Sequence, residues 1–497
     1  MQDSRARSST HLFSHRPRQA PRTHVVQGSH VKPRPTEDVN EELDIVTNPL
    51  DDAPLSRFHK KLAVFSSGGP FLDGFVLSII GVAMIQIADQ WGLSSVEQGL
   101  VGASSLIGIL LGAFAGGWLT DRFGREVLFT VDLIAIAAFS VAQFFVQDVI
   151  WLIVLRLLIG MAVGADYPIA TSLLTEFTPR KYRGPFLGAF VAMWFVGAAA
   201  AYVVGQILAE TGNDNAWRWM LAGATVPAVL IVVARVGTPE SPRWLVGKGR
   251  IDEANKVLRK VFGPDVSVAD LPAEDENSVS VKELVRSGYG KRMAFITLFW
   301  TCSIVPLFAV YAFAPAILSA LELEEDAAHI GSAVITILFL VGCIIALFLV
   351  NRMGRRPLLI HSFLWAGLAL LLMGVFTEAP TSIIMVFFAA YAVLIGGTQI
   401  LQWVYPNELF PTEIRGTAVG MASSLSRIGA AVGTFLVPLS LSGLGIGATM
   451  LIAAVITLLG AVLSHFWAPE TRGLSLTESA SLGIAGSPVS PARASRS

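Results

Sequence analysis

Long runs of apolar residues, separated by short polar loops, dominate the chain from about residue 62 onward. Twelve of these runs are long enough to cross a hydrocarbon layer of about 30 Å as helices. They form two groups of six, with a longer polar stretch between the groups. The expected spans lie at 62–90, 97–120, 127–146, 149–176, 184–208, 216–237, 292–321, 328–350, 357–377, 381–407, 415–440 and 443–467. This pattern predicts an all-α membrane protein with twelve transmembrane helices.

The polar stretches divide the chain into five predicted segments. These are a disordered cytosolic tail at 1–60, a first six-helix half at 61–237, a cytosolic linker at 238–291, a second six-helix half at 292–468 and a cytosolic tail at 469–497. The first tail is rich in Arg, Pro and Ser and lacks an apolar signal-peptide core, so we do not expect a cleaved secretory signal. Part of the linker has apolar residues at helical spacing and predicts a short amphipathic helix. These residues are Ile251, Ala254, Leu258 and Val261.

Composition agrees with a membrane protein and excludes several other classes. The 497 residues are 53% hydrophobic and 15% charged, with a mean hydropathy of +0.61, whereas soluble domains are about 25% charged. Cys302 and Cys343 lie in apolar runs, which argues against a disulfide framework or a metal cluster. The chain has no phosphate-binding loop of the ATPase type, and nothing in it favours an enzyme or a nucleic-acid-binding protein. We therefore expect an ion gradient to supply the energy.

The distribution of Lys and Arg predicts which side of the membrane each loop faces. Basic residues gather before the first span, in alternate loops and at the end of the linker, whereas the intervening loops carry mostly acidic residues. Because positively charged loops stay in the cytosol, we expect a multi-pass protein of the cell membrane with both termini cytosolic. We expect it to act as a monomer. The basic residues are Arg57, Lys60, Lys61, Arg122, Arg125, Arg180, Lys181, Arg183, Lys291, Arg292, Arg352, Arg355, Arg356 and Arg415.

Short motifs recur at nearly constant spacing in the two halves. Glu176 and Arg183 have counterparts 232 positions later, at Glu408 and Arg415. The loop GGWLTDRFGRE has a weaker copy, NRMGRRP, 230 positions later. The linker opens with PESPRWL, and PETRGL follows the last span at the same spacing of 230. These landmarks indicate a duplicated six-helix unit, and transporters built from such parallel repeats place the substrate between the halves.

Several motifs together resemble the major facilitator superfamily, and within it the sugar porters and related metabolite–proton symporters. The resemblance covers about residues 60–475. It implies the major facilitator fold and transport by alternating access. The motifs are Gly-x-x-x-Asp-Arg-x-Gly-Arg (Gly117, Asp121, Arg122, Gly124, Arg125), TrpArgTrpMet at Trp217–Met220, PESPRWL at Pro239–Leu245, Trp403 five residues before Glu408, and PETRGL at Pro469–Leu474.

The resemblance also implies that the motif loops form a cytosolic gate of ion pairs. Two residues depart from the family pattern, because Glu126 stands where a basic residue is usual and Asn351 stands where the second copy can carry Asp. Both changes are expected to loosen the network. The expected gate residues are Gly117, Asp121, Arg122, Arg125, Glu176, Arg183, Glu240, Arg243, Arg352, Arg355, Glu408, Arg415, Glu470 and Arg472.

Three charged residues inside the predicted spans suggest proton coupling: Asp73 in span one and Arg156 and Asp166 in span four. At about 1.5 Å per residue, Asp73 and Arg156 can meet near mid-membrane. If their separation changes as the halves rock, Asp73 binds and releases one proton per cycle. The resemblance agrees, because sugar-porter-like symporters pair an Asp of span one with an Arg of span four; a static ion pair is the alternative. Asp166 lies roughly 15 Å from Arg156 along the helix, which predicts a separate site.

Arg427 in span eleven has no acidic residue at comparable depth in the second half. A buried arginine without a partner is costly, so we expect it to meet Asp73 or Asp166 across a central cavity, a helix C-terminus, or an anionic substrate. Aromatic and amide side chains are expected to line the same cavity, with packing as the alternative role for Trp403. The predicted substrate-binding residues are Arg427, Trp403, Gln399, Gln402, Trp194, Trp300 and Tyr311.

The sequence therefore favours a secondary active transporter that couples protons to a small polar metabolite of the sugar or polyol class. No cofactor is expected beyond the proton gradient. Spans five and seven lack the glutamine-rich pattern of sugar porters, and Ala165–Pro168 and Ser426–Gly429 look more like phosphate and organic-ion carriers. A proton symporter of an organic anion, such as an aromatic or other carboxylic acid or phosphate, is the alternative. A nutrient sensor that keeps the fold without transporting is a remote third.

Overall fold

The computed structural model describes residue 50, residues 53–271, 289–320, 325–410 and 412–474, and residue 479. In these ranges the secondary structure is helical and contains no strand. Most of the two predicted tails and residues 272–288 of the linker lie outside the described residues. The surroundings of Gly117 and the side chains of Asp121, Arg183, Tyr311 and Arg415 also lie outside them.

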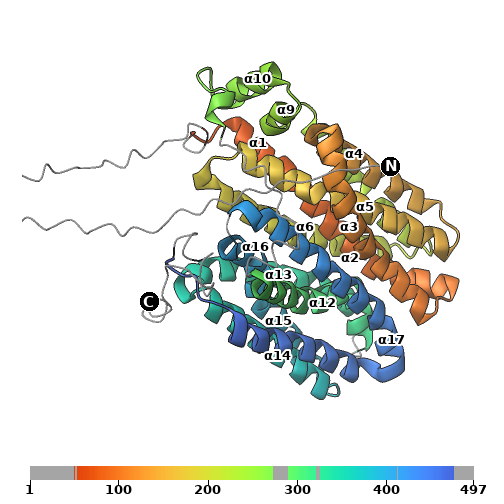
Figure 1. The fold of residues 1–497 in the computed structure, drawn as a ribbon. Coiled ribbons are helices and arrows are strands. Elements are labelled where there is room, and N and C mark those ends of the chain that lie inside the picture. The colour runs from red at the N-terminus through yellow and green to blue at the C-terminus, as the bar shows by residue number, and fades with distance from the viewer. Residues whose placement is uncertain are drawn as a thin grey trace, which may run out of the picture. The chain divides into compact units, whose positions relative to one another are not determined.

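Helices α1 to α8 form the first half of the fold. They are α1 (Arg57–Ser66), α2 (Gly68–Trp91), α3 (Ser95–Phe123), α4 (Arg125–Phe144), α5 (Val149–Phe177), α6 (Arg180–Ala209), α7 (Ala216–Ala222) and α8 (Thr225–Arg235) (Figure 1). The first crossing is divided at Ser67, between α1 and α2. The sixth is divided at Gly223 and Ala224, between α7 and α8. These eight helices therefore provide six crossings.

Helices α12 to α17 form the second half. They are α12 (Gly290–Ala320), α13 (Glu325–Met353), α14 (Arg355–Val375), α15 (Thr381–Leu394), α16 (Gly396–Leu409) and α17 (Thr412–Trp467) (Figure 1). The 56 residues of α17 would span about 84 Å if straight, far more than one membrane crossing. The helix is interrupted at Gly445, whose φ of 79° is a left-handed conformation that glycine adopts readily. α17 therefore contains two crossings.

By length and hydropathy, eleven helical segments of the described chain qualify as membrane spans. The last of them, Ala418–Trp467, contains the break at Gly445 and so counts twice, which gives the twelve spans predicted. The outer surface suits lipid, since the large apolar side chains of Ile150, Val233 and Phe348 are each 68% exposed.

Glycines at four-residue spacing bring helices into close contact. A methyl group at Gly108 or Gly112 of α3 would overlap the backbone of α5. A methyl group at Gly160 or Gly164 of α5 would likewise overlap the backbone of α3. These glycines therefore have the packing role that their spacing favours. Contacts of α2 with α12, α3 with α17, and α6 with α13 join the two halves.

The linker contains α9 (Pro242–Gly247), α10 (Ile251–Phe262) and the 3-10 turn η1 (Val268–Asp270), drawn in green beside α1 and α4 in Figure 1. The apolar face of α10 is folded inward. Leu258 is fully buried and packs with Leu50 and Val266. Val261 packs against the apolar cluster that contains Phe177 of α5. This part of the linker is therefore packed onto the first half.

Candidate transport site

A cavity between the two halves has a free volume of about 60 Å³. Its walls come from α2, α5 and α6 of the first half and from α12, α16 and α17 of the second. Typical ligand pockets measure about 300–1,000 Å³, so side chains must move apart before a metabolite can enter. The predicted substrate-binding residues that line the cavity are Arg427, Trp403, Gln399, Gln402, Trp194 and Trp300. We call it the central cavity.

Aromatic rings form much of the wall of the central cavity. Trp300 of α12 and Trp403 of α16 meet edge to face, with ring centroids 5.6 Å apart and planes at 72°. Trp194 of α6 meets Phe308 of α12 in the same manner, at 5.8 Å and 87°. The second pair joins opposite halves. Trp403 thus packs against another ring and also faces the cavity, so both roles considered for it are compatible with its position.

Two buried glutamines supply polar groups to the cavity wall. The Nε2 atoms of Gln399 and Gln402 donate to Ser303 Oγ at 2.8 and 2.7 Å. Ser303 Oγ also lies 2.6 Å from Thr398 Oγ1. This network fixes both amide groups of α16 against α12, so the orientation of the glutamines depends on the contact between these two helices.

Arg427 brings a positive charge to the central cavity. Its Cζ atom lies 4.9 Å from the centre of the Phe308 ring, a cation–π contact. Its Nη1 atom is buried and, among the described residues, has no hydrogen-bond partner. Arg427 interacts electrostatically with Asp73 across the two halves, which is one of the partners expected from the sequence. The free N–H groups remain available to oxygen atoms of a substrate.

Asp73 of α2 is completely buried. Its Oδ2 atom accepts hydrogen bonds from Tyr167 Oη of α5 at 2.6 Å and from Trp194 Nε1 of α6 at 2.9 Å. Its Oδ1 atom is buried without a hydrogen-bond partner in the described part of the chain. Trp194 lines the central cavity, so one side chain touches both the carboxylate and the cavity.

Arg156 does not form the predicted ion pair with Asp73 in this conformation. Its Nε atom donates to Val101 O of α3 at 3.2 Å, and both terminal nitrogens lie 3.5 Å from Val76 O of α2. The close packing of α3 and α5 turns the guanidinium toward α3. Arg156 therefore meets α2 at Val76, about one helical turn from Asp73, and its direction around α5 differs from the prediction.

Asp166 pairs with Arg235 of α8, which is not among the predicted site residues. Arg235 Nη1 donates to Asp166 Oδ1 at 2.8 Å, and Nη2 donates to Oδ2 at 3.4 Å. Asp132 Oδ1 of α4 lies 3.8 Å from the same Nη1 atom. Both Asp132 and Arg235 lie inside predicted spans, so the rule that singled out Asp73 would have found them as well. Asp166 therefore belongs to a separate site, as its distance from Arg156 indicated.

The motif loops of the first half form a compact network. Arg125 forms an ion pair with Glu176 of α5 and donates through Nη1 to Ser241 Oγ at 2.9 Å. Glu240 accepts from the backbone N–H groups of Arg125 at 3.0 Å and Glu126 at 3.1 Å. Its carboxylate therefore caps the N-terminus of α4, where the helix dipole favours negative charge. We call this set the first motif network.

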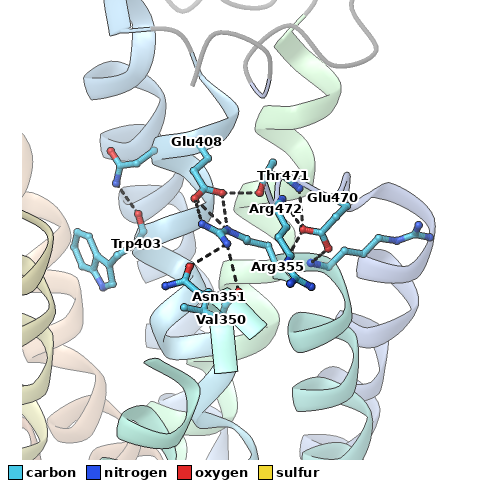
Figure 2. Close-up of polar contacts among 10 residues, drawn as sticks. Val350, Asn351, Arg355, Trp403, Glu408, Glu470, Thr471 and Arg472 are labelled. Atoms are coloured by element: carbon cyan, nitrogen blue, oxygen red, sulfur yellow. Dashed lines mark hydrogen bonds and ion pairs between the residues drawn. The ribbon is translucent and has the colours of Figure 1, made fainter. Parts of the chain in front are cut away.

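The second half repeats this arrangement, and Figure 2 shows the contacts of this second copy. Arg355 Nη2 donates to Glu408 Oε1 at 2.7 Å, and Thr471 Oγ1 donates to Glu408 Oε2 at 2.5 Å. Glu470 accepts from the backbone N–H groups of Arg355 at 3.0 Å and Arg356 at 3.1 Å, and so caps α14. We call this set the second motif network. Each of its contacts has a counterpart about 230 positions earlier.

The hydrogen bonds and ion pairs described above for each motif network join residues of the same half. Arg122 and Arg352 have exposed side chains, and Arg243 is half-buried. The backbone N–H of Arg472 donates to Glu470 at 2.8 Å. Arg355 also donates to Asn351 Oδ1 at 3.3 Å, so this departure from the family pattern keeps a hydrogen bond but lacks a charge.

A second cavity lies entirely within the second half and is larger, at about 370 Å³. Its walls come from α12, α14 and both crossings of α17 and are almost wholly apolar. Ser440 and Thr449 are polar exceptions, and their hydroxyl groups are 2.7 Å apart and bond each other. A polar metabolite finds few partners there. The smaller central cavity, with Arg427 and two amides, is therefore the better transport site.

The chain matches the family described as "Sugar (and other) transporter" over residues 56–482. The chain belongs to this family. Members of the sugar (and other) transporter family, part of the major facilitator superfamily, carry small molecules across membranes and are not enzymes. The protein is thus a multi-pass membrane transporter with the twelve-helix major facilitator fold.

Known members of the family align over most of the chain. It is 42% identical over 438 residues to YaaU of Escherichia coli (strain K12), named as a candidate metabolite transport protein, covering 88% of this chain and 98% of YaaU. It is 27% identical over 458 residues to the arabinose-proton symporter of Bacillus subtilis (strain 168), covering 87% and 98%. A partially occluded, inward-open structure of the xylose transporter XylE from E. coli matches with a TM-score of 0.73, at 22% identity over 84% of this chain and 100% of that one. At that identity the structural likeness supports the fold alone.

Proposed function

We propose that this transporter is a proton symporter that carries a small polar metabolite of the sugar or polyol class by alternating access. It resides in the cell membrane with both termini in the cytosol and works as a monomer. The proton gradient supplies the energy, and no cofactor takes part. The arabinose-proton symporter among its relatives supports this proposal.

The contact between Asp73 and Trp194 is the observation that carries the proposal. Trp194 donates to Asp73 Oδ2 while its ring faces the central cavity. When Asp73 binds a proton, it loses negative charge and the hydrogen bond from Trp194 weakens. The position of the Trp194 ring in the cavity wall then depends on whether Asp73 carries a proton. Substrate binding and proton binding are linked by this shared side chain, as symport requires.

Arg156 and Asp166 complete the proposed coupling route. Arg156 binds the backbone of α2 at Val76, about one helical turn from Asp73. A small shift of α5 relative to α2 would bring the Arg156 guanidinium toward the Asp73 carboxylate. The positive charge then favours the ionised form of Asp73. Tyr167 is bonded to Asp73 and follows Asp166 in the chain. Protons are thus proposed to move between the cavity and the interior of the first half.

An organic anion is the second candidate substrate, and Arg427 favours it. A guanidinium with an unpartnered Nη1 atom in a cavity is suited to a carboxylate or a phosphate. The aromatic walls suit the face of a sugar ring or of an aromatic acid.

Duplicated motif networks in both halves favour a moving transporter over a static sensor.

Uptake into proteoliposomes with an imposed pH gradient tests the proposed function. The full chain is reconstituted and offered labelled sugars, polyols and organic acids. We expect accumulation of one class above its external concentration when the outside is acidic, and loss of accumulation when a protonophore collapses the gradient. Uptake that ignores the gradient across the whole panel would exclude proton symport. The class of compound that accumulates in the proteoliposomes shows whether the substrate is neutral or anionic.

A further inference from the structure

Three charged side chains meet inside the first half, away from the central cavity. They are Asp132 of α4, Asp166 of α5 and Arg235 of α8, and we call them the buried triad. Their side chains are 4%, 3% and 0% exposed. Arg235 binds both carboxyl groups and also donates to Phe129 O of α4 at 2.6 Å and Phe65 O at the end of α1 at 3.2 Å.

The charges of the buried triad do not cancel if both aspartates are ionised. One guanidinium faces two carboxylates, which leaves one buried negative charge. Other ionisable groups near it, Asp73 of α2 and Tyr167 of α5, also interact with Asp166 and bring no positive charge. Asp132 Oδ2 is buried and has no hydrogen-bond partner among the described residues. An uncompensated charge of this kind is strongly disfavoured in a low-dielectric interior.

Both carboxyl groups of the buried triad meet the same nitrogen atom, because Arg235 Nη1 lies 2.8 Å from Asp166 Oδ1 and 3.8 Å from Asp132 Oδ1. Two carboxylates accept but do not donate, so a hydrogen bond between them requires a proton on one oxygen. One proton also removes the excess charge. The geometry and the charge count therefore lead to the same protonation state.

We propose that Asp132 and Asp166 share a single proton beside Arg235, forming a second proton-binding site of the transporter. The proton forms an O–H bond on one carboxyl oxygen and is accepted by the other carboxylate, and it returns to water when that bond breaks. This proposal deepens the proposed proton symport, on which its transport role rests. What it adds is Asp132 as a proton-binding residue and Arg235 as the residue that positions the pair.

The position of the buried triad gives its proton a structural effect. Arg235 holds the carbonyl of Phe65 at the junction of α1 and α2, and Asp166 Oδ2 lies against Gly69, where a methyl group would overlap it. When the proton leaves, the second carboxylate competes for Arg235. The guanidinium then moves toward the aspartates and its bond to Phe65 weakens. Proton release at the triad thus loosens the start of α2, the helix that carries Asp73.

Infrared difference spectroscopy of the full chain in lipid, titrated from acidic to alkaline pH, tests this proposal. A protonated carboxyl group has a C=O stretching band that a carboxylate lacks. We expect one such band to disappear in Asp132→Asn and the same band to disappear in Asp166→Asn, because one remaining carboxylate balances the single positive charge of Arg235 and leaves no excess charge for a proton to remove. Asp73→Asn is the matched control and should keep this band. Loss of the band in only one of the two variants, or in neither, would overturn the shared proton.

A further variant separates a shared proton from a purely structural role. Arg235→Gln removes the positive charge, so the band should persist to more alkaline pH, whereas Arg235→Lys should leave it nearly in place. An unchanged band in Arg235→Gln would contradict the positioning role. If Asp132→Asn does not fold, Asp166→Asn and this pair of variants test the same site. The spectra need no substrate, so they test the shared proton independently of the transport assay. Either hypothesis can be contradicted while the other is supported.

Discussion

The two halves repeat the same contacts at their motif loops but differ in the charged residues of their interiors. In the first half Arg125 pairs with Glu176, and in the second Arg355 pairs with Glu408. The interior of the first half holds Asp73 and the buried triad, whereas the second half contributes Arg427 to the central cavity. The two halves therefore share the ion pairs of their motif networks, whereas the charged residues inside their membrane spans differ. We propose that the first half binds the protons, while both halves line the substrate cavity and the second supplies its positive charge.

The largest effect should come from Asp73→Asn, which removes the ionisable group that contacts the cavity wall. We expect gradient-driven accumulation to be abolished while exchange of labelled for unlabelled substrate continues, because exchange needs no net proton movement. Accumulation and counterflow in proteoliposomes measure the two activities. Asp89→Asn is the control, since Asp89 is an exposed residue of the same helix. Accumulation equal to that of the unaltered protein would rule out Asp73 as the coupling residue.

Arg427→Gln should have the next largest effect and tests the substrate role of the second half. A lost hydrogen bond to a charged group costs about 1.5–3 kcal/mol, so an anionic substrate should bind roughly 10-fold to 100-fold more weakly. A neutral substrate should change much less. Binding isotherms for one ligand of each kind measure the difference, and Arg427→Lys should retain part of the anion affinity. Equal losses for both ligands would return Arg427 to a structural role.

Glu176→Gln and Glu408→Gln test whether the motif networks are equivalent. Each change removes a partly buried ion pair with side chains 11–19% exposed, and each should destabilise the protein by about 1–2 kcal/mol. The two networks share no residue, so the double variant should show the sum of the single effects. Thermal unfolding in detergent measures all three variants. A double variant far from the sum would mean that the networks act across the halves.

The smallest effect is expected from Asn351→Asp, which restores the charge missing from the second motif network. Arg355 already donates to Asn351 Oδ1 at 3.3 Å. An ion pair at this exposed position should stabilise the protein by about 0.2–1 kcal/mol. The gain should shrink at high salt, since exposed charges are screened. A stabilisation that is independent of salt would need an explanation other than charge.

The features that depend on the length of apolar runs and on the spacing of motifs along the chain were predicted well from the sequence. The lengths of the apolar runs predict the twelve crossings, and the spacing of 230 residues predicts that Glu470 is the counterpart of Glu240. Six of the seven predicted substrate-binding residues line the central cavity, Arg427 from the middle of its predicted span and Gln402 and Trp403 from the end of theirs.

The predicted pairing of charges failed where rotation around a helix matters. Asp73 and Arg156 lie at compatible depths, but Gly160 brings α5 so close to α3 that Arg156 turns to Val101. Arg235, the partner of Asp166, also lies inside its predicted span at 216–237 but was not among the predicted site residues. Helix packing, which depends on many side chains at once, decides both outcomes.

The capping residues Glu240 and Glu470 have a consequence for the origin and the divisibility of this fold. Each caps a helix of its own half from a segment that follows the last span of that half. Each half therefore contains both the helix and the glutamate that caps it. An ancestor of half the length would already have had this capping contact before the gene was duplicated. A chain divided after residue 271 likewise leaves each fragment with its own capping glutamate.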